Sequence, residues 1–187
     1  MKPADQVQSS SNIDNGVYTS VIEDYRLALA NEDVSYLEKY GIHSLEGYPL
    51  MGKAVQHSNG WCHGYSIKDI NGDGIEELLI GYNPDAGLTS LAVSGVEAIY
   101  TIKDGKVVYV CGVSDRYNSD ILMRNDGTFY IYERNYPTVD VQHYKLQDGT
   151  LVLIDSFQGE GDGFVGGYSD ESVDSSLRQN LTLFESN

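Results

Sequence analysis

The chain has 187 residues, with 28 Asp and Glu against 12 Lys and Arg, a net charge of −16 and a pI near 4.3. This length suits one domain. The acidic excess argues against a nucleic-acid partner, because binding a phosphate backbone needs clustered cations, and against an anionic membrane surface. No apolar stretch approaches the roughly 18 residues of a membrane span, so we expect no membrane insertion.

The first residues have the composition of a tether. Met1 and Lys2 are followed by a polar, uncharged run over residues 6–12, which is typical of what remains after a targeting segment is removed. We therefore expect residues 1–13 to be disordered and the protein to be extracellular or attached to the cell envelope.

Residues 14–41 have a helical pattern. Asp33 is placed to cap a second, short helix, and Gly41 suits the residue that ends it. Apolar residues recur at the spacing of one helix face, and these are Val17, Val21, Tyr25 and Ala28.

Residues 69–78 read DINGDGIEEL and have the pattern of a calcium-binding loop. Ca²⁺ is a hard cation that takes about six to eight oxygen ligands. Gly74 falls at position 6, where a chain that wraps an ion turns sharply. The predicted ligands fall at positions 1, 3, 5, 7 and 9, and they are the side chains of Asp69, Asn71, Asp73 and Glu77 with the main-chain carbonyl of Ile75.

This loop is not an EF-hand, because position 12 is Ile80 where an EF-hand needs a bidentate Glu. The apolar run 78–82 that follows is typical of a buried strand.

The loop resembles the DxNxDGxxEL loops of FG-GAP and VCBS-type repeats. The wider layout resembles a group of uncharacterised secreted proteins and lipoproteins from Gram-positive bacteria. The resemblance implies a metal and a location, but no activity. The alternative to a calcium site is that these residues form only a polar turn between strands.

Three Asp-Gly dipeptides, at 104–105, 126–127 and 148–149, predict hairpins with two-residue type I′ turns. We therefore predict a β-meander over residues 61–157, within a single α+β domain spanning 14–187. The N-terminal helical segment would pack on this sheet, which could close partly into a barrel or propeller-like form, and residues 158–187 would form a loop and tail. The predicted facing pairs are Ile102–Val107, Tyr100–Tyr109, Ala98–Cys111, Met123–Tyr130, Ile121–Tyr132, Leu146–Leu151 and Tyr144–Leu153.

Two further features leave alternatives open. Cys62 and Cys111 form one disulfide if the protein is exported, or they are two half-buried thiols, which we favour. Glu160 and Asp162, in a glycine-rich segment, are candidates for a second cation site.

The functional prediction is a calcium-binding extracytoplasmic module, binding or structural, without catalytic activity. Its 15 tyrosines suit a carbohydrate or peptide ligand, although β-sheets use tyrosine freely. The alternative is a hydrolase of cell-wall or dietary polysaccharide or peptide. Cys62 and His63 would point to opposite faces of a strand, and His143, expected to face Ile154, suits a packed sheet histidine. Neither favours catalysis.

Overall fold

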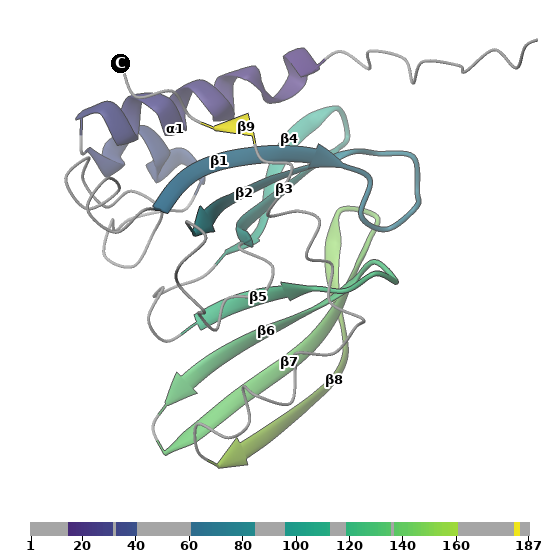
Figure 1. The fold of residues 1–187 in the computed structure, drawn as a ribbon. Helices are drawn as coiled ribbons and strands as arrows, with labels where there is room; N and C mark the ends of the chain where they lie inside the picture. The colour runs from purple at the N-terminus through teal and green to yellow at the C-terminus, as the bar shows by residue number, and fades with distance from the viewer. Residues whose placement is uncertain are drawn as a thin grey trace, which may run out of the picture.

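A computed structural model describes residues 15–31, 33–40, 61–84, 96–112, 119–135, 137–160 and 182–183. The fold is α+β, as predicted, with a short helical part followed by a mostly antiparallel sheet (Figure 1). The expected tether, residues 1–13, and residues 161–181 lie outside the described residues. Within the described part, no helix is long and apolar enough to cross a membrane.

The helical part has three pieces, and nine strands follow. The pieces are η1 (Asn15–Tyr18), α1 (Thr19–Asn31) and η2 (Val34–Tyr40). The strands are β1 (Trp61–Lys68), β2 (Glu77–Pro84), β3 (Val96–Lys103), β4 (Lys106–Gly112), β5 (Ser119–Met123), β6 (Thr128–Asn135), β7 (Thr138–Gln147), β8 (Thr150–Glu160) and β9 (Thr182–Leu183). The predicted end of the sheet at residue 157 is therefore wrong. β8 continues three residues further, and β9, within the predicted C-terminal tail, pairs with β1.

The helix buries most of its predicted face. Val21, Tyr25 and Ala28 are fully buried, but Val17 is 39% exposed and Tyr18 is buried in its place. The prediction failed there because residues 15–18 form a 3₁₀ turn, whose three residues per turn shift the phase of the apolar face. The predicted cap is confirmed, since Asp33 Oδ1 accepts a hydrogen bond of 2.9 Å from the Ser35 N–H.

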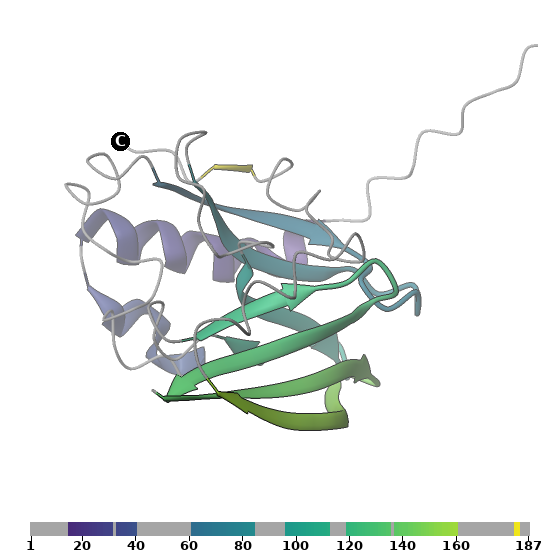
Figure 2. The ribbon, with the colours of Figure 1, turned by 60° about the horizontal axis from the view of Figure 1, so that its bottom comes forward.

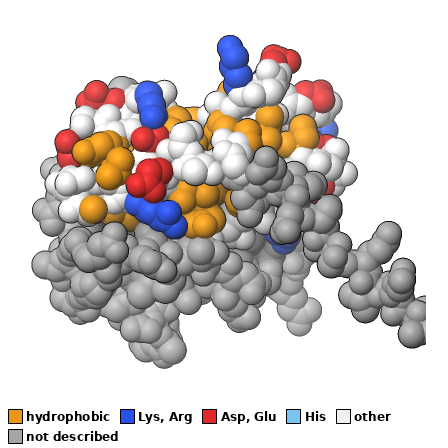
Figure 3. All heavy atoms as spheres, turned by 90° about the horizontal axis from the view of Figure 1, so that it is seen from above, with side chains coloured by type: hydrophobic (Ala, Val, Ile, Leu, Met, Phe, Trp, Pro, Cys, Tyr) orange, Lys and Arg blue, Asp and Glu red, His pale blue; other side chains and the backbone are white. Residues whose placement is uncertain are grey.

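The outer surface of the helical part is charged. Glu23 pairs with Arg26 at 3.6 Å, and Asp24 with Lys39 at 2.6 Å. Seen from above, the described part of the molecule shows acidic, basic and apolar side chains interspersed (Figure 3). This mixture is typical of a solvated surface.

The sheet has the strand order β8-β7-β6-β5-β3-β2-β1-β9, and β4 pairs with β3 off this path. The prediction of a simple meander is therefore wrong at β4, because β5 joins β3 through the Val96–Ile121 pair. The sheet forks there and does not close into a barrel.

The first hairpin has the predicted turn. Asp104 and Gly105 have φ of 53° and 72°, as a type I′ turn requires, and the predicted pairs next to the turn are confirmed. Further out the prediction is wrong, because a bulge between Ile99 and Tyr100 shifts the register so that Ala98 faces Gly112.

The second hairpin has a three-residue loop. Arg124 N–H donates to the Thr128 carbonyl at 2.9 Å, and Gly127 has φ of 80°. This loop suits a type I turn with a bulge, so the register moves by one residue. Met123 faces Phe129, and Ile121 faces Ile131.

The third hairpin confirms the predicted turn and its two facing pairs, Leu146–Leu151 and Tyr144–Leu153. A bulge next to these pairs sets His143 opposite Asp155 instead of the predicted Ile154. The extra residue in β8 could not be read from the turn.

In the described residues, two larger apolar cores separate three layers (Figures 1 and 2), and a third, smaller cluster lies on the other face of β5–β7. The first lies between the helical part and β2–β4, where the Tyr25 hydroxyl hydrogen-bonds the Tyr100 hydroxyl at 2.9 Å. The second lies on the opposite face of β2 and β3, against β5–β8. Both faces of β2 and β3 are therefore buried, as the apolar run in β2 predicted.

Cys111 lies in the second core as a free thiol. Burial raises its pKa to about 12, so this thiol stays protonated and unreactive at neutral pH. Cys111 is not part of a disulfide in this structure, as the favoured alternative expected, although it is buried and not half-buried. The side chain of Cys62 lies outside the described part of the structure, as do Glu160's side chain and Asp162.

We predict that Gly127→Ala destabilises the protein by about 2–4 kcal/mol, from positive-φ strain together with steric overlap. A Cβ on Gly127 would collide with the Ile70 carbonyl oxygen. The matched control is Gly105→Ala, where φ is 72° but no atom lies within 4 Å of the new Cβ, and strain alone costs about 1–2 kcal/mol. Urea denaturation measures both. Equal losses would contradict the contact between the β5–β6 turn and Ile70.

Candidate metal centre

The predicted calcium loop connects β1 to β2, which pair so that Lys68 and Glu77 face each other at its base. Gly72 and Gly74 have φ of 77° and 87°, a region that glycine occupies without strain. Nothing lies within 4 Å of a Cβ built on either residue. Glycine is therefore favoured at these two positions by the positive φ of the backbone and not by a lack of space for a side chain.

Inside the loop, the side chains of Asp69, Asn71 and Asp73 each accept from a backbone N–H further along the chain. Asp69 Oδ1 accepts from Gly72 at 2.7 Å, and its Oδ2 accepts from Gly74 at 2.9 Å. Asn71 Oδ1 accepts from Asp73 at 3.0 Å, and Asp73 Oδ1 accepts from Ile75 at 2.8 Å. These bonds curl the chain tightly around its own oxygen-bearing side chains.

The same bonds affect the charge state of Asp69. Partial burial acts to raise its pKa, but the N–H groups of Gly74, Gly72 and their neighbours outweigh it and hold the pKa below the usual value. Asp69 is therefore a carboxylate at neutral pH, as a metal ligand must be.

Glu77 is the buried carboxylate of the loop, with no surface exposed to solvent. Its Oε2 accepts from the Ile70 N–H at 3.1 Å, and its Oε1 accepts from the Thr101 hydroxyl at 2.8 Å. Burial raises the pKa of Glu77. These two hydrogen bonds oppose the rise, and the negative charges of Asp73 and Asp69 add to it.

The structure brings the predicted ligands into one loop between β1 and β2. Among the described residues, no three Asp, Glu, His or Cys side chains lie close enough together to hold a metal ion. The carboxylates instead bond to the N–H groups of the loop and to Thr101. Ile75 has a hydrocarbon side chain without donor atoms, so only its main-chain carbonyl could contribute a ligand.

The loop also contacts the other layers of the fold, which sequence reasoning missed. Ile70 is buried in the second core, and Gly127 abuts its carbonyl. The Asn71 amide donates to the Leu146 carbonyl at 3.3 Å, and the Tyr18 hydroxyl donates to the Glu76 carbonyl at 2.7 Å. The apolar residue at position 2, Ile70, was the indication in the sequence that one side of the loop is covered.

The hydrolase alternative draws attention to a chain of polar contacts around His143. Its Nε2 lies 2.9 Å from Thr128 Oγ1, and its Nδ1 lies 3.5 Å from Asp155 Oδ1. This is the order of a hydroxyl–imidazole–carboxylate triad. However, the Thr128 hydroxyl donates its proton to Asp126 Oδ1 at 2.6 Å, and hydrogen bonds from Thr128 hold the pKa of Asp126 low.

The directions of these hydrogen bonds differ from those of a catalytic triad and suit a structural role. The Thr128 hydroxyl donates its single proton in the hydrogen bond to Asp126, so its oxygen accepts from His143, and His143 cannot act as the base that activates it. His143 is also stacked on Tyr130, with ring centroids 4.3 Å apart. The predicted packed sheet histidine agrees with this arrangement, although its facing residue was wrong.

Comparison of the chain with protein families, with curated proteins and with solved structures finds no match. The function is therefore inferred from the fold and the chemistry of the loop.

We predict that Thr101→Val destabilises the protein by about 1–3 kcal/mol, because the buried Glu77 carboxylate loses a hydrogen bond that water cannot replace. Thermal and urea denaturation measure the loss. The matched control is Thr150→Val, whose hydroxyl accepts from Lys103 in an exposed contact, and this change should cost less than about 0.5 kcal/mol. A Thr101→Val variant as stable as the control would show that Glu77 is solvated or otherwise satisfied.

Proposed function

We propose that this protein is a calcium-binding extracytoplasmic module in which the ion has a structural role, and that its activity is binding and not catalysis. The observation that carries the proposal is the Glu77 carboxylate. It is buried, its two hydrogen-bond partners in the described residues are neutral, and two further carboxylates, Asp69 and Asp73, raise its pKa.

Magnitudes favour a cation at this position. Burying an ionised carboxylate costs several kcal/mol even after relaxation of the protein. Each hydrogen bond to a charged group contributes about 1.5–3 kcal/mol, so the bonds from Ile70 and Thr101 offset part of this cost. These hydrogen bonds do not offset the electrostatic repulsion between the carboxylates of Asp69, Asp73 and Glu77. A divalent cation bound between them would offset it.

The donor set fits calcium. All the predicted ligands are oxygens, which suit a hard cation. A carboxylate oxygen has more than one acceptor site, so the bonds from backbone N–H groups to Asp69 and Asp73 leave capacity for an ion. Mg²⁺ is expected to bind less well, because it demands near-ideal octahedral geometry.

The extracytoplasmic location has two supports. The wider layout of the chain resembles secreted proteins and lipoproteins of Gram-positive bacteria, and the outer side of the loop is open, since Asp73 is exposed. An exposed loop of this kind suits the affinities of extracellular calcium modules, with Kd of about 10⁻⁴–10⁻³ M. Calcium at such concentrations is found outside cells.

We predict that chelator-treated protein binds one Ca²⁺ in calorimetry, that Mg²⁺ gives weaker binding, and that Asp73→Ala abolishes calcium binding. A ligand at about a hundred times its Kd stabilises the folded state by about 2.7 kcal/mol. For a protein of this size the melting temperature should rise by roughly 5–10 °C.

The control for this experiment is Asp104→Asn, which removes one negative charge from a hairpin turn outside the loop. Both variants carry the same net charge, so a general attraction of cations to an acidic protein would weaken equally in both. An equal loss of calcium affinity in both variants would contradict the proposal. A melting temperature that changes with neither calcium nor chelator would also contradict it.

A further inference from the structure

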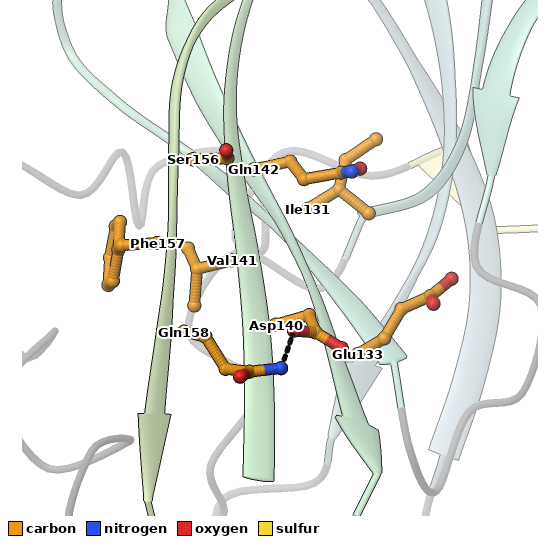
Figure 4. Close-up of a pocket in the computed structure, with 8 residues that line it drawn as sticks. All are labelled: Ile131, Glu133, Asp140, Val141, Gln142, Ser156, Phe157 and Gln158. Carbon is orange, nitrogen blue, oxygen red and sulfur yellow. Dashed lines mark hydrogen bonds between the residues drawn. The ribbon is translucent and has the colours of Figure 1, made fainter.

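The face of β5–β8 that carries the second core continues beyond it as a groove of about 460 Å³ (Figure 4). Toward the β7–β8 turn this face is apolar, with Phe129 and Leu146 buried. Beyond Ile131 it becomes polar. The groove lies on this polar half.

Strand register shows that the groove is a two-row array across β6, β7 and β8. Side chains that face one another across strands, or stand two residues apart along a strand, share one face of a sheet. The rows are therefore about 6–7 Å apart. One row is Glu133, Asp140 and Gln158, and the other is Ile131, Gln142 and Ser156.

Asp140 is held in place at the centre of the first row. The Gln158 amide donates to its Oδ1 at 2.6 Å, and the Asn135 amide donates to its Oδ2 at 3.2 Å. Figure 4 shows the Gln158 and Asp140 side chains meeting, with Glu133 beside them. The carboxylate is thus oriented before any ligand arrives, which lowers the entropy cost of binding.

The groove offers hydrogen-bond acceptors and donors together. Glu133, Asp140 and the Gln158 carbonyl oxygen are acceptors. Gln142 uses its oxygen to accept from the Tyr144 hydroxyl at 2.9 Å, so it presents its NH₂ group as a donor. The Ser156 hydroxyl can serve as either, and Ile131, Val141 and Phe157 add apolar surface.

This inventory selects one class of ligand. Among the described residues, the groove is lined by two carboxylates and by no Lys or Arg, so it repels an anion. An apolar ligand would desolvate five polar side chains without compensation. A bare cation would satisfy the carboxylates but not the Gln142 donor. Sugar hydroxyls are donors and acceptors at once, and a sugar ring also has an apolar C–H face.

We propose that this groove binds a neutral saccharide unit, with Asp140, Glu133, Gln142 and Gln158 as its hydrogen-bond partners. The inference extends the binding-module part of the proposed function and is independent of the metal. Small polar ligands of this size give Kd in the millimolar range.

The test is amide NMR of the ¹⁵N-labelled full chain, titrated with glucose, galactose and N-acetylglucosamine, and with glucuronate, spermidine and Ca²⁺ as comparisons. At least one neutral sugar should shift amides of residues 131–133, 140–142 and 156–158 and leave 69–77 unchanged. Glucuronate should bind more weakly than the neutral sugar.

Substitutions sharpen this test. Gln142→Ala and Asp140→Asn should each weaken sugar binding up to about tenfold, as expected for one lost hydrogen bond. Gln147→Ala, an exposed glutamine at the far end of β7, should leave binding unchanged.

The inference is overturned if no neutral sugar at about 50 mM, well above a millimolar Kd, shifts the groove amides. It is also overturned if only spermidine or Ca²⁺ does so, which would make the groove a cation site. Either result leaves the calcium response of residues 69–77 intact, so failure of this inference and failure of the metal proposal are distinguishable.

Discussion

A buried carboxylate at the first residue of β2 constrains the rest of this structure. Glu77 is fully shielded from solvent and holds the two ends of its loop together, since it accepts from Ile70 on one side and from Thr101 in β3 on the other. Its position at the start of a strand buried on both faces leaves it no route to water. The charge of Glu77 must therefore be stabilised by groups inside the protein and not by water.

Because of this constraint, the loop also joins the layers of the fold. Tyr18 reaches it from the helical part, and Gly127 and the Leu146 carbonyl reach it from the β5–β8 side. A change in the conformation of the loop would therefore alter the packing of both cores. The structural role that we propose for the ion would thus extend beyond the loop, since an ion that fixes the loop would also fix how the β5–β8 strands meet β2 and β3.

Local chemistry explains which features could be predicted from the sequence. Asp-Gly at 104–105 and 148–149 determines turn type through backbone conformation alone, and the adjacent pairs were correct. Bulges after Ile99 and at Ile154 depend on tertiary packing, so the registers beyond them were wrong. The pairing of β5 with β3 is a contact between distant segments that no turn residue encodes.

The same division holds for the candidate sites. The oxygen-bearing residues of the loop were identified because their spacing is local. The contacts of Ile70 with the second core and of Thr101 with Glu77 were missed, because they come from strands 24 or more residues away. The groove over β6–β8 arises only when three strands align Glu133, Asp140 and Gln158 in one row.

The most direct test of the central claim is a crystal structure of the protein grown with calcium. We expect one ion about 2.3–2.6 Å from oxygens of Asp69, Asn71, Asp73 and Glu77 and from the Ile75 carbonyl, with calcium identified by its anomalous scattering. A loop without an ion at saturating calcium, whose carboxylates still bond only to the backbone N–H groups and Thr101, would contradict it.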